Sequence, residues 1–306
     1  MKRLLGLLAI AVASVACNDA PQKASYFPPP GADSGPTADT EADTGDTGLS
    51  DTSEPEPDVA PDSSAPDTGR HDAGPAPDAG PRRVQVSWDF DNGKQGWKVG
   101  LSDYSHGDSP TEKYNFEHGV RQLPADLGRT GKGLYASSFN KADDLFMFLK
   151  HRLGQKHGLV PDTAYQITWR ILMGSTAPSG GCPGIGGSPG EGVSVKAGGS
   201  KLEPRTVVDP TGRVVMNVDH GGNSTSGRAA TVLGTMANGV PCDEADGDYR
   251  VIERTGTHQR TVRTDQNGEL WLLAGTDSGF EGTTSPYYLQ IDVALTPVAA
   301  DSLHTE

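Results

Sequence analysis

The fold is decided by the stretch Tyr165-Gln166-Ile167-Thr168-Trp169-Arg170-Ile171-Leu172-Met173. Its large apolar side chains alternate with polar ones at Gln166, Thr168 and Arg170, and this period of two is typical of a strand with one buried face. The turn sequence Pro161-Asp162-Thr163 comes directly before it. The stretch therefore predicts a long half-buried strand that begins at a turn.

The same period recurs towards both ends of the chain. Near the beginning the apolar positions are Val84, Val86, Trp88 and Phe90, and near the end they run through odd-numbered positions of the segment 287–295. Further strands are predicted at residues 134–137, 144–150, 193–197, 213–218, 259–264 and 269–274. No helical stripe of useful length occurs, although residues 142–152 could alternatively form a short helix. Roughly ten short strands between Gly-rich turns predict an all-β fold, a jelly-roll β-sandwich over residues 84–298 with a disordered tail at 299–306.

The segment before the sandwich has a different composition. Residues 18–83 hold 14 acidic and 4 basic residues, 12 of the 23 prolines, and Asp-Thr-Gly at 43–45, 46–48 and 67–69. Such a segment cannot bury enough apolar surface to offset chain entropy, so residues 17–83 are expected to form a disordered, extended linker.

Charge separates the two parts of the chain as well. Residues 84–306 hold 26 acidic and 20 basic residues, so most of the net charge of −14 belongs to the linker. No basic stripe that would neutralise phosphates occurs, and we therefore expect no nucleic-acid partner.

The N-terminus predicts export. Residues 1–16 read as a signal peptide, with Lys2 and Arg3 ahead of a short apolar run. The following Ser14-Val15-Ala16-Cys17 resembles the lipobox of bacterial lipoproteins, with Ser14 in the place where Leu is usual. The resemblance implies acylation of Cys17, for example by palmitate, and anchoring to the membrane. The resemblance also implies a sorting rule, in which Asp directly after the lipidated cysteine retains a lipoprotein at the inner membrane. Asn18 occupies that place in this sequence, which favours the outer membrane of the cell envelope. An ordinary signal peptide with an incidental cysteine is the alternative.

Three blocks of the sequence carry a family resemblance. They are Trp88-Asp89-Phe90-Asp91-Asn92-Gly93 followed by Gln95-Gly96-Trp97, then residues 159–167, and finally residues 288–295. Together they resemble jelly-roll carbohydrate-binding modules with the galactose-binding-like fold. The resemblance implies a non-catalytic domain that binds a carbohydrate and is displayed on the linker, facing the cell surface or the periplasm.

Two other functions remain open at this point. One is a structural or adhesive envelope protein without a small ligand. The other is a polysaccharide hydrolase or lyase, which would need a pair of carboxylates drawn from Asp143, Asp144, Glu191 and Glu281.

Two loops have the composition that sugar binding requires, namely aromatic faces next to carboxylates and amides. The candidate ligand-binding residues are Tyr104, Tyr114 and Phe116 in one loop, and Phe280, Glu281 and Tyr287 in the other. Aromatic residues in loops also pack locally, which is the alternative for each of them.

The resemblance also implies a structural Ca²⁺ between the first and last strands. Calcium prefers oxygen ligands, and the residues that would supply them are Asp89, Asp91, Asn92 and Asp292. Alternatively, residues 91–93 form only a turn and Asp292 is a solvated strand residue.

The remaining cysteines, Cys182 and Cys242, both lie in predicted loops. With Cys17 lipidated, they are the two thiols left in an oxidising compartment, which predicts a disulfide. Such a bond closes a loop of about 60 residues and stabilises the fold by roughly 4 kcal/mol in the chain-entropy model. Two free thiols are the alternative.

Lipidation gives a direct prediction. Cells that express the chain should incorporate a labelled fatty acid into it, and Cys17→Ala should abolish the incorporation because it removes the acceptor thiol. The label is followed by fluorography after immunoprecipitation. Label that persists in the Cys17→Ala variant contradicts the anchor.

Overall fold

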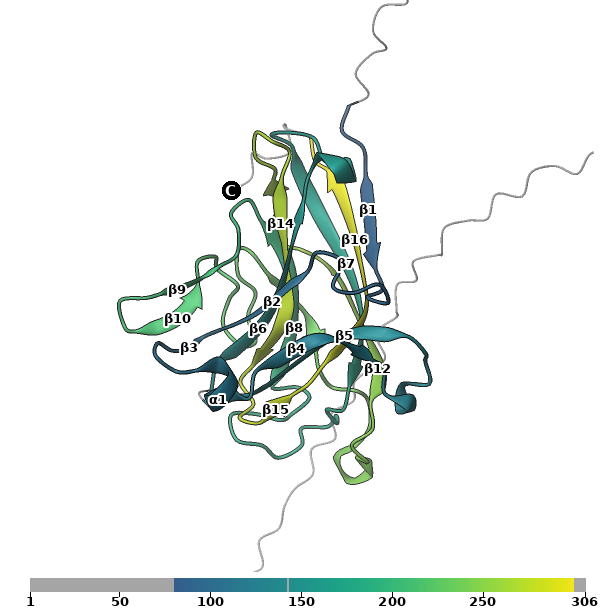
Figure 1. The fold of residues 1–306 in the computed structure, drawn as a ribbon, viewed down its shortest axis with the longest axis vertical. Coiled ribbons are helices and arrows are strands. Elements are labelled where there is room, and N and C mark those ends of the chain that lie inside the picture. The colour runs from purple at the N-terminus through teal and green to yellow at the C-terminus, as the bar shows by residue number, and fades with distance from the viewer. Residues whose placement is uncertain (1–79, 142, 300–306) are drawn as a thin grey trace, which may run out of the picture. The chain divides into compact units, whose positions relative to one another are not determined.

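The computed structural model describes residues 80–141 and 143–299, and these residues form antiparallel β-sheets almost throughout (Figure 1). Cys17, the signal peptide, the predicted linker up to residue 79 and residues 300–306 lie outside the described residues. Within the described part, no helix is long and apolar enough to cross a membrane.

One layer of the sandwich is an eight-stranded sheet. Its central strands are β7 (Ala164–Ser175) and β16 (Tyr287–Pro297), which pair antiparallel over ten positions. The other strands of this sheet are β1 (Val84–Trp88), β4 (Glu117–Gln122), β5 (Lys132–Phe139), β12 (Arg250–Thr257), β13 (Val262–Arg263) and β15 (Thr283–Thr284).

The other layer is a five-stranded sheet. Its strand order is β11 (Thr231–Thr235), β8 (Val193–Ser200), β14 (Leu270–Ser278), β6 (Leu145–Leu153) and β2 (Lys98–Ser102). A small third sheet, in which β10 lies between the other two strands, consists of β3 (Tyr104–Ser105), β9 (Thr206–Val208) and β10 (Arg213–Met216). Helical turns are confined to α1 (Pro110–Tyr114), η1 (Ala125–Leu127), η2 (Gln155–His157) and η3 (Cys242–Glu244).

The connectivity confirms the predicted jelly-roll β-sandwich. The chain crosses between the two large sheets after β1, β5, β6 and β7, and again after β11, β13 and β14. The structure has sixteen strands in its described part, more than the ten or so expected. The strands that were not predicted include β4, β11 and β12, and also β3, β9 and β15, which are pairings of only two or three residues. Such short pairings leave no periodic signal in a sequence.

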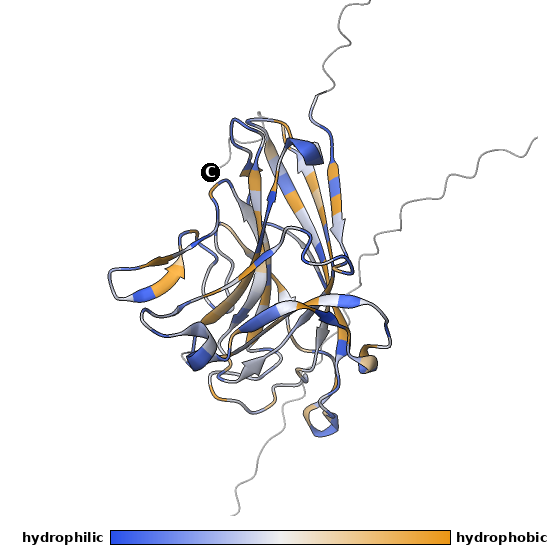
Figure 2. Cartoon of the chain, viewed as in Figure 1, coloured by the Kyte–Doolittle hydropathy of each residue, from blue (hydrophilic) through white to orange (hydrophobic). Residues whose placement is uncertain are grey.

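The core between the sheets follows the predicted alternation. In β7, Tyr165, Ile167, Trp169 and Ile171 are fully buried and belong to the main hydrophobic cluster. Figure 2 shows hydrophobic and hydrophilic residues alternating along β1, which lies beside β16. Leu172, on the opposite face, packs in a separate cluster with Leu127 of η1. The outer face of this sheet is therefore partly covered as well.

Residues 145–153 form the strand β6, so the alternative of a short helix in the segment 142–152 is wrong. In β6, Leu145, Met147, Leu149 and Leu153 are buried on the core side of the sheet. Phe146 belongs to a different cluster on the other face. Successive side chains of a strand point to opposite faces, so Phe146 belongs to a different cluster from Leu145 and Met147.

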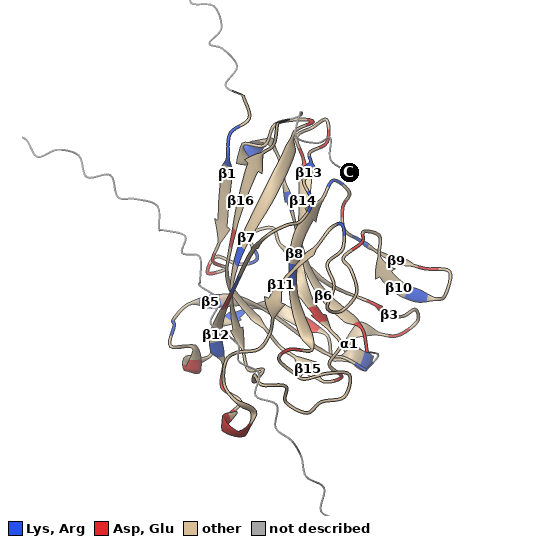
Figure 3. Cartoon of the chain, turned by 180° about the vertical axis from the view of Figure 1, so that it is seen from behind, with Lys and Arg blue, Asp and Glu red and all other residues tan. Residues whose placement is uncertain are grey.

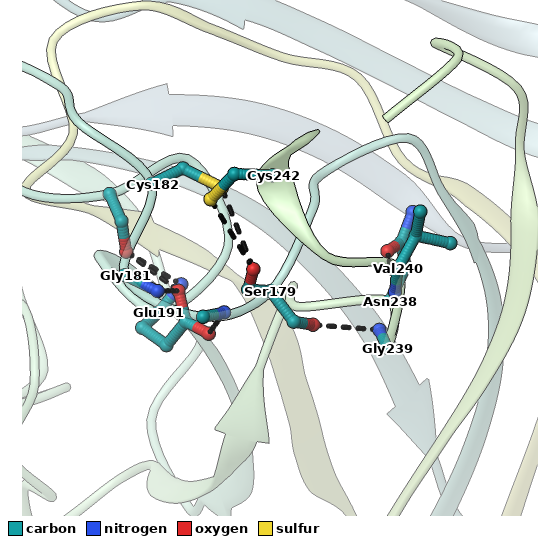
Figure 4. The surroundings of a disulfide bond; sticks show 10 residues. Ser179, Gly181, Cys182, Glu191, Asn238, Gly239, Val240 and Cys242 are labelled. Atoms are coloured by element: carbon teal, nitrogen blue, oxygen red, sulfur yellow. Dashed lines mark hydrogen bonds between the residues drawn. A yellow bond between two sulfur atoms is a disulfide. The ribbon is translucent and has the colours of Figure 1, made fainter. Parts of the chain in front are cut away.

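The disulfide between Cys182 and Cys242 is confirmed, with 5.5 Å between the Cα atoms. Around it, the backbone N–H of Ser179 donates to the Val240 carbonyl at 2.8 Å, and the N–H of Gly239 donates to the Ser179 hydroxyl at 2.7 Å (Figure 4). The Glu191 carboxylate accepts the N–H groups of Gly180 and Gly181. The bond and these contacts join the Gly-rich loop before β8 to the loop before β12.

Candidate functional site

The outer face of the five-stranded sheet is covered by residues 201–230, which we call the covering segment and which include β9 and β10. The rings of Phe146 and Phe148, on β6, pack closely against this face because Gly100 of β2 and Gly275 of β14 have no side chain there. A Cβ on Gly100 would lie 2.4 Å from the Phe148 ring, and one on Gly275 would lie 2.7 Å from the Phe146 ring. The covering segment adds apolar contacts to form one cluster, which consists of Phe146, Phe148, Met216, Ala229, Ala230 and Leu273.

A buried lysine connects the sheet to the covering segment. Lys196 of β8 is fully buried, and its Nζ donates to Asp277 Oδ2 of β14 at 2.7 Å. It also donates to the carbonyl oxygens of Gly222 at 2.6 Å and His220 at 3.2 Å. All three donors of the ammonium group are therefore used, two of them by the covering segment.

His220 brings the covering segment into the same cluster of charges. Its Nδ1 lies 3.3 Å from Asp277 Oδ2 and its Nε2 lies 3.2 Å from Asp103 Oδ2. The imidazole stacks on Phe146 with 4.5 Å between ring centroids. We call Asp103, Lys196, His220 and Asp277 the buried ionic cluster. Lys196 and Asp277 lie on the neighbouring strands β8 and β14, and Figure 3 colours the basic and acidic residues of this sheet.

The backbone at Asp103 explains how its carboxylate reaches His220. Adjacent residues of a strand point to opposite faces, but Asp103 follows β2 with a φ of 71° and Ser102 donates to its Oδ2 at 2.8 Å. Asp tolerates this left-handed conformation better than most residues. The turn thus places both side chains on the covered face.

The cluster shifts the pKa values of His220 and Asp277. Burial disfavours the imidazolium form of His220, but the two carboxylates outweigh burial and raise its pKa to about 9. Burial likewise opposes ionisation of Asp277, yet His220 and Lys196 lower its pKa. At the edge of the cluster, burial and the charges of Asp103 and Asp277 raise the pKa of Asp144 to about 6. The cluster therefore holds opposite charges in a buried place at neutral pH.

A second contact holds the start of the covering segment. Lys150 Nζ, on the outer face of β6, donates to Glu203 Oε1 at 2.8 Å and to the Pro204 carbonyl at 2.7 Å. The same ammonium lies 5.5 Å from the ring centroid of Trp271. Residues 203–204 and 220–222 are thus both attached to the sheet by buried or half-buried lysines.

A groove of about 840 Å³ lies where the covering segment passes the end of β8 and the turn before β13. Its lining combines charged, amide, hydroxyl and aliphatic side chains. The lining residues are 199–202, 217–219, 228–229 and 259–263, together with Gln166. Gln259 and Thr261 are exposed there, and their side chains form no hydrogen bond within the described part of the chain. The groove therefore offers uncommitted polar groups to a ligand.

The first predicted aromatic loop is mostly packed. Tyr114 is 1% exposed and its hydroxyl donates to Asp108 at 2.8 Å. Tyr104 and Phe116 are partly exposed and pack against the same hydrophobic cluster, with 5.6 Å between the Tyr104 and Tyr114 ring centroids. The loop forms one local cluster, and its part in ligand binding stays a prediction.

The second predicted loop lies in other clusters. Phe280 packs against the main core and beside Gly282, where a Cβ would lie 2.3 Å from its ring. Tyr287 is buried against Tyr135 and Tyr249. Glu281 hydrogen-bonds Asp143, which raises the pKa of Glu281. The predicted aromatics are thus divided among three hydrophobic clusters, and no residue of either loop lines the groove.

The predicted calcium ligands take part in other contacts. Asp292 accepts from Arg170 at 2.8 Å and from Ser87 at 2.5 Å. Asp91 accepts the N–H of Lys132 at 2.7 Å, and Asp89 accepts Gln95 Nε2 at 3.0 Å. Asn92 is exposed in the turn after them. Among the described residues, no group of three or more His, Cys, Asp or Glu could hold a metal ion. Calcium binding at these positions stays a prediction.

The candidate binding residues that the sequence analysis missed are those that line the groove. Its four basic residues are Lys201, Arg228, Arg260 and Arg263, which are spread over more than sixty positions. No spacing or motif connects them. The four basic residues come together only because the covering segment folds back towards β13 and the turn before it. No signal in the sequence could therefore have identified the groove.

No family model and no curated protein matches the sequence. Among solved structures, a cleaved adhesin domain of Lys-gingipain from Porphyromonas gingivalis matches with a TM-score of 0.33 and 11% identity, over 71% of this chain and 99% of that one. The CBM22-1 xylan-binding domain of Xyn10C from Paenibacillus barcinonensis matches with a TM-score of 0.32 and 11% identity, over 70% and 95%.

A third similar structure is CBM27-1 from Caldicellulosiruptor saccharolyticus in complex with mannohexaose. Its TM-score is 0.32 and its identity 15%, over 71% of this chain and 98% of that one. At such TM-scores, nothing about the ligand of this chain follows from the three similarities.

The raised pKa of His220 predicts that stability falls at alkaline pH. The folded pKa of about 9 lies above the unfolded value of 6.5, so the stabilisation is complete below pH 6.5 and is lost as the pH rises through 9. The free energy of unfolding should fall by about 2 kcal/mol between pH 7 and pH 10. Urea unfolding at each pH measures it.

The matched variant for this prediction is His220→Gln, which cannot titrate. It should be less stable at pH 7, because Asp103 and Asp277 keep their charges without a cation at this position. Its loss of stability between pH 7 and pH 10 should be smaller than that of the native chain. An equal loss in both proteins contradicts the role of His220.

Proposed function

We propose that this chain is a membrane-anchored, non-catalytic carbohydrate-binding protein whose sandwich domain binds its ligand in the groove beside the covering segment. The observation that carries the proposal is the groove itself, which is large enough for several sugar rings and exposes uncommitted amide and hydroxyl groups. Sugar hydroxyls need such hydrogen-bond partners next to apolar patches, and Leu202, Val218 and Val262 supply the patches.

The N-terminal sequence supports the anchoring part of the proposal. The lipobox-like residues 14–17 provide the acylation site, and the acidic residues 18–83 separate it from the sandwich domain. Repulsion between the like charges and the fixed φ of the prolines favour an extended spacer. The proposed location is the outer membrane, with the domain presented to a surface or periplasmic carbohydrate.

A polysaccharide hydrolase is the second candidate, and the raised pKa of Asp144 is the observation that favours it. A general acid with a pKa near 6 suits glycoside hydrolysis, but it needs an accessible second carboxylate about 5–9 Å away. Asp277 is fully buried and Asp103 is 6% exposed. Asp143 and Glu281 lie within hydrogen-bond range of each other, which is closer than that mechanism allows. The carboxylates therefore favour binding without catalysis.

The test is binding of the full chain to a panel of soluble neutral and acidic polysaccharides in affinity gel electrophoresis. At least one polysaccharide should retard the native protein. Gln259→Ala should weaken that binding about five-fold, because it removes one ligand hydrogen bond. Gln266→Ala is the matched control, since Gln266 is exposed but lies outside the groove, and it should change nothing.

Three results would contradict the proposal. Failure to bind any polysaccharide would favour a structural or adhesive role. Release of reducing ends from the same polysaccharides would favour the hydrolase. Weakening by Tyr104→Ala or Phe280→Ala, with Gln259→Ala silent, would move the site to the predicted aromatic loops.

A further inference from the structure

The charge of the groove is opposite to the charge of its surroundings. Acidic residues outnumber basic ones by 26 to 20 in residues 84–306. The groove is nevertheless lined by Lys201, Arg228, Arg260 and Arg263, with Asp219 as the single carboxylate among its described lining residues. A concave surface lined by one sign of charge focuses its potential on a ligand of the other sign.

The negative charge of Asp219 is largely engaged by the backbone. Its Oδ2 accepts the N–H of Arg228 at 3.0 Å and its Oδ1 accepts the N–H of Gly221 at 2.9 Å. These bonds lower the pKa of Asp219 and hold it at the turn that follows His220. Of the groove cations, Lys201, Arg228 and Arg263 form no ion pair with any carboxylate in the described part of the chain. Their charges remain available to a ligand.

The described residues that line the groove also include no aromatic residue. Neutral sugars gain much of their affinity by stacking on aromatic faces, and single-stranded nucleic acids stack their bases in the same way. Recognition in this groove therefore has to come from hydrogen bonds and charge. Guanidinium groups suit this task because their donors match the two oxygens of a carboxylate or the oxygens of a sulfate.

We propose that the groove binds an acidic polysaccharide, with Lys201, Arg228, Arg260 and Arg263 contacting carboxylate or sulfate groups along the chain while Gln259 and Thr261 bind neutral hydroxyls. This inference rests on the proposed carbohydrate-binding function and specifies its ligand class. The groove's volume of about 840 Å³ and its mixture of charged and neutral groups fit a polymer with one charge per sugar or per disaccharide better than a small anion.

The experiment compares chemically matched probes on the full chain. Polygalacturonate is compared with its carboxyl-reduced form, and dextran sulfate with dextran, so that each pair differs only in charge. The native protein should bind at least one acidic member at least tenfold more tightly than its neutral partner. Its affinity should fall as salt is added, because exposed charge pairs are screened.

The variants are matched in net charge. Lys201→Gln/Arg228→Gln removes two groove cations and should weaken binding of the acidic probe about tenfold. Arg129→Gln/Lys132→Gln removes two exposed cations outside the groove and should leave binding unchanged. Circular dichroism and the thermal midpoint check that both variants fold like the native chain.

The outcomes separate this inference from the proposed function. In one outcome, the native protein binds acidic and neutral probes equally, and Gln259→Ala still weakens the binding. That result overturns the proposal of an acidic ligand but leaves the proposed carbohydrate binding in place. Equal affinity for duplex DNA of the same charge also overturns it, since the groove would then bind any polyanion. Failure to bind any of the probes or the wider panel overturns both proposals.

Discussion

The ammonium group of Lys196 is fully buried, and this single constraint explains how the covered face of the sandwich is built. A buried charge is stable only when it is paired and its donors are satisfied. Asp277 supplies the opposite charge from the neighbouring strand, but two of the three donors need the carbonyl oxygens of His220 and Gly222. The covering segment must therefore lie on the sheet, and the groove exists because that segment passes the end of β8 on its way there.

Much of the fold could be predicted from the sequence, because the alternation in β1, β7 and β16 depends only on which face of a strand is buried. The disulfide was predictable because Cys182 and Cys242 are the two cysteines that remain once Cys17 is assigned to lipidation, and the predicted compartment is oxidising. The buried ionic cluster was not predictable, since Lys196 and Asp277 are 81 positions apart and only the strand order makes them neighbours. The predicted aromatic loops were chosen by composition, but composition does not distinguish a ring that packs locally, such as Tyr114, from one that faces a ligand.

The net charge of the whole chain is a poor guide to the local charge of its groove. The sequence has a net charge of −14, with its acidic residues concentrated in residues 18–83. The groove nevertheless collects four cations from three separate segments of the chain. Screening limits the effect of distant exposed charges to about 8 Å in physiological salt. A ligand in the groove therefore responds to the local cations much more than to the overall charge.

The most direct test of the account is hydrogen–deuterium exchange, followed by mass spectrometry, on the native chain and on a Lys196→Met variant at pH 7. Methionine fills a similar volume but cannot bind the carbonyl oxygens of His220 and Gly222. If the buried ionic cluster holds the covering segment, exchange should become faster in residues 201–230 and stay slow in β7 and β16. Unchanged exchange in residues 201–230, or an equal increase throughout the sandwich, would contradict the account.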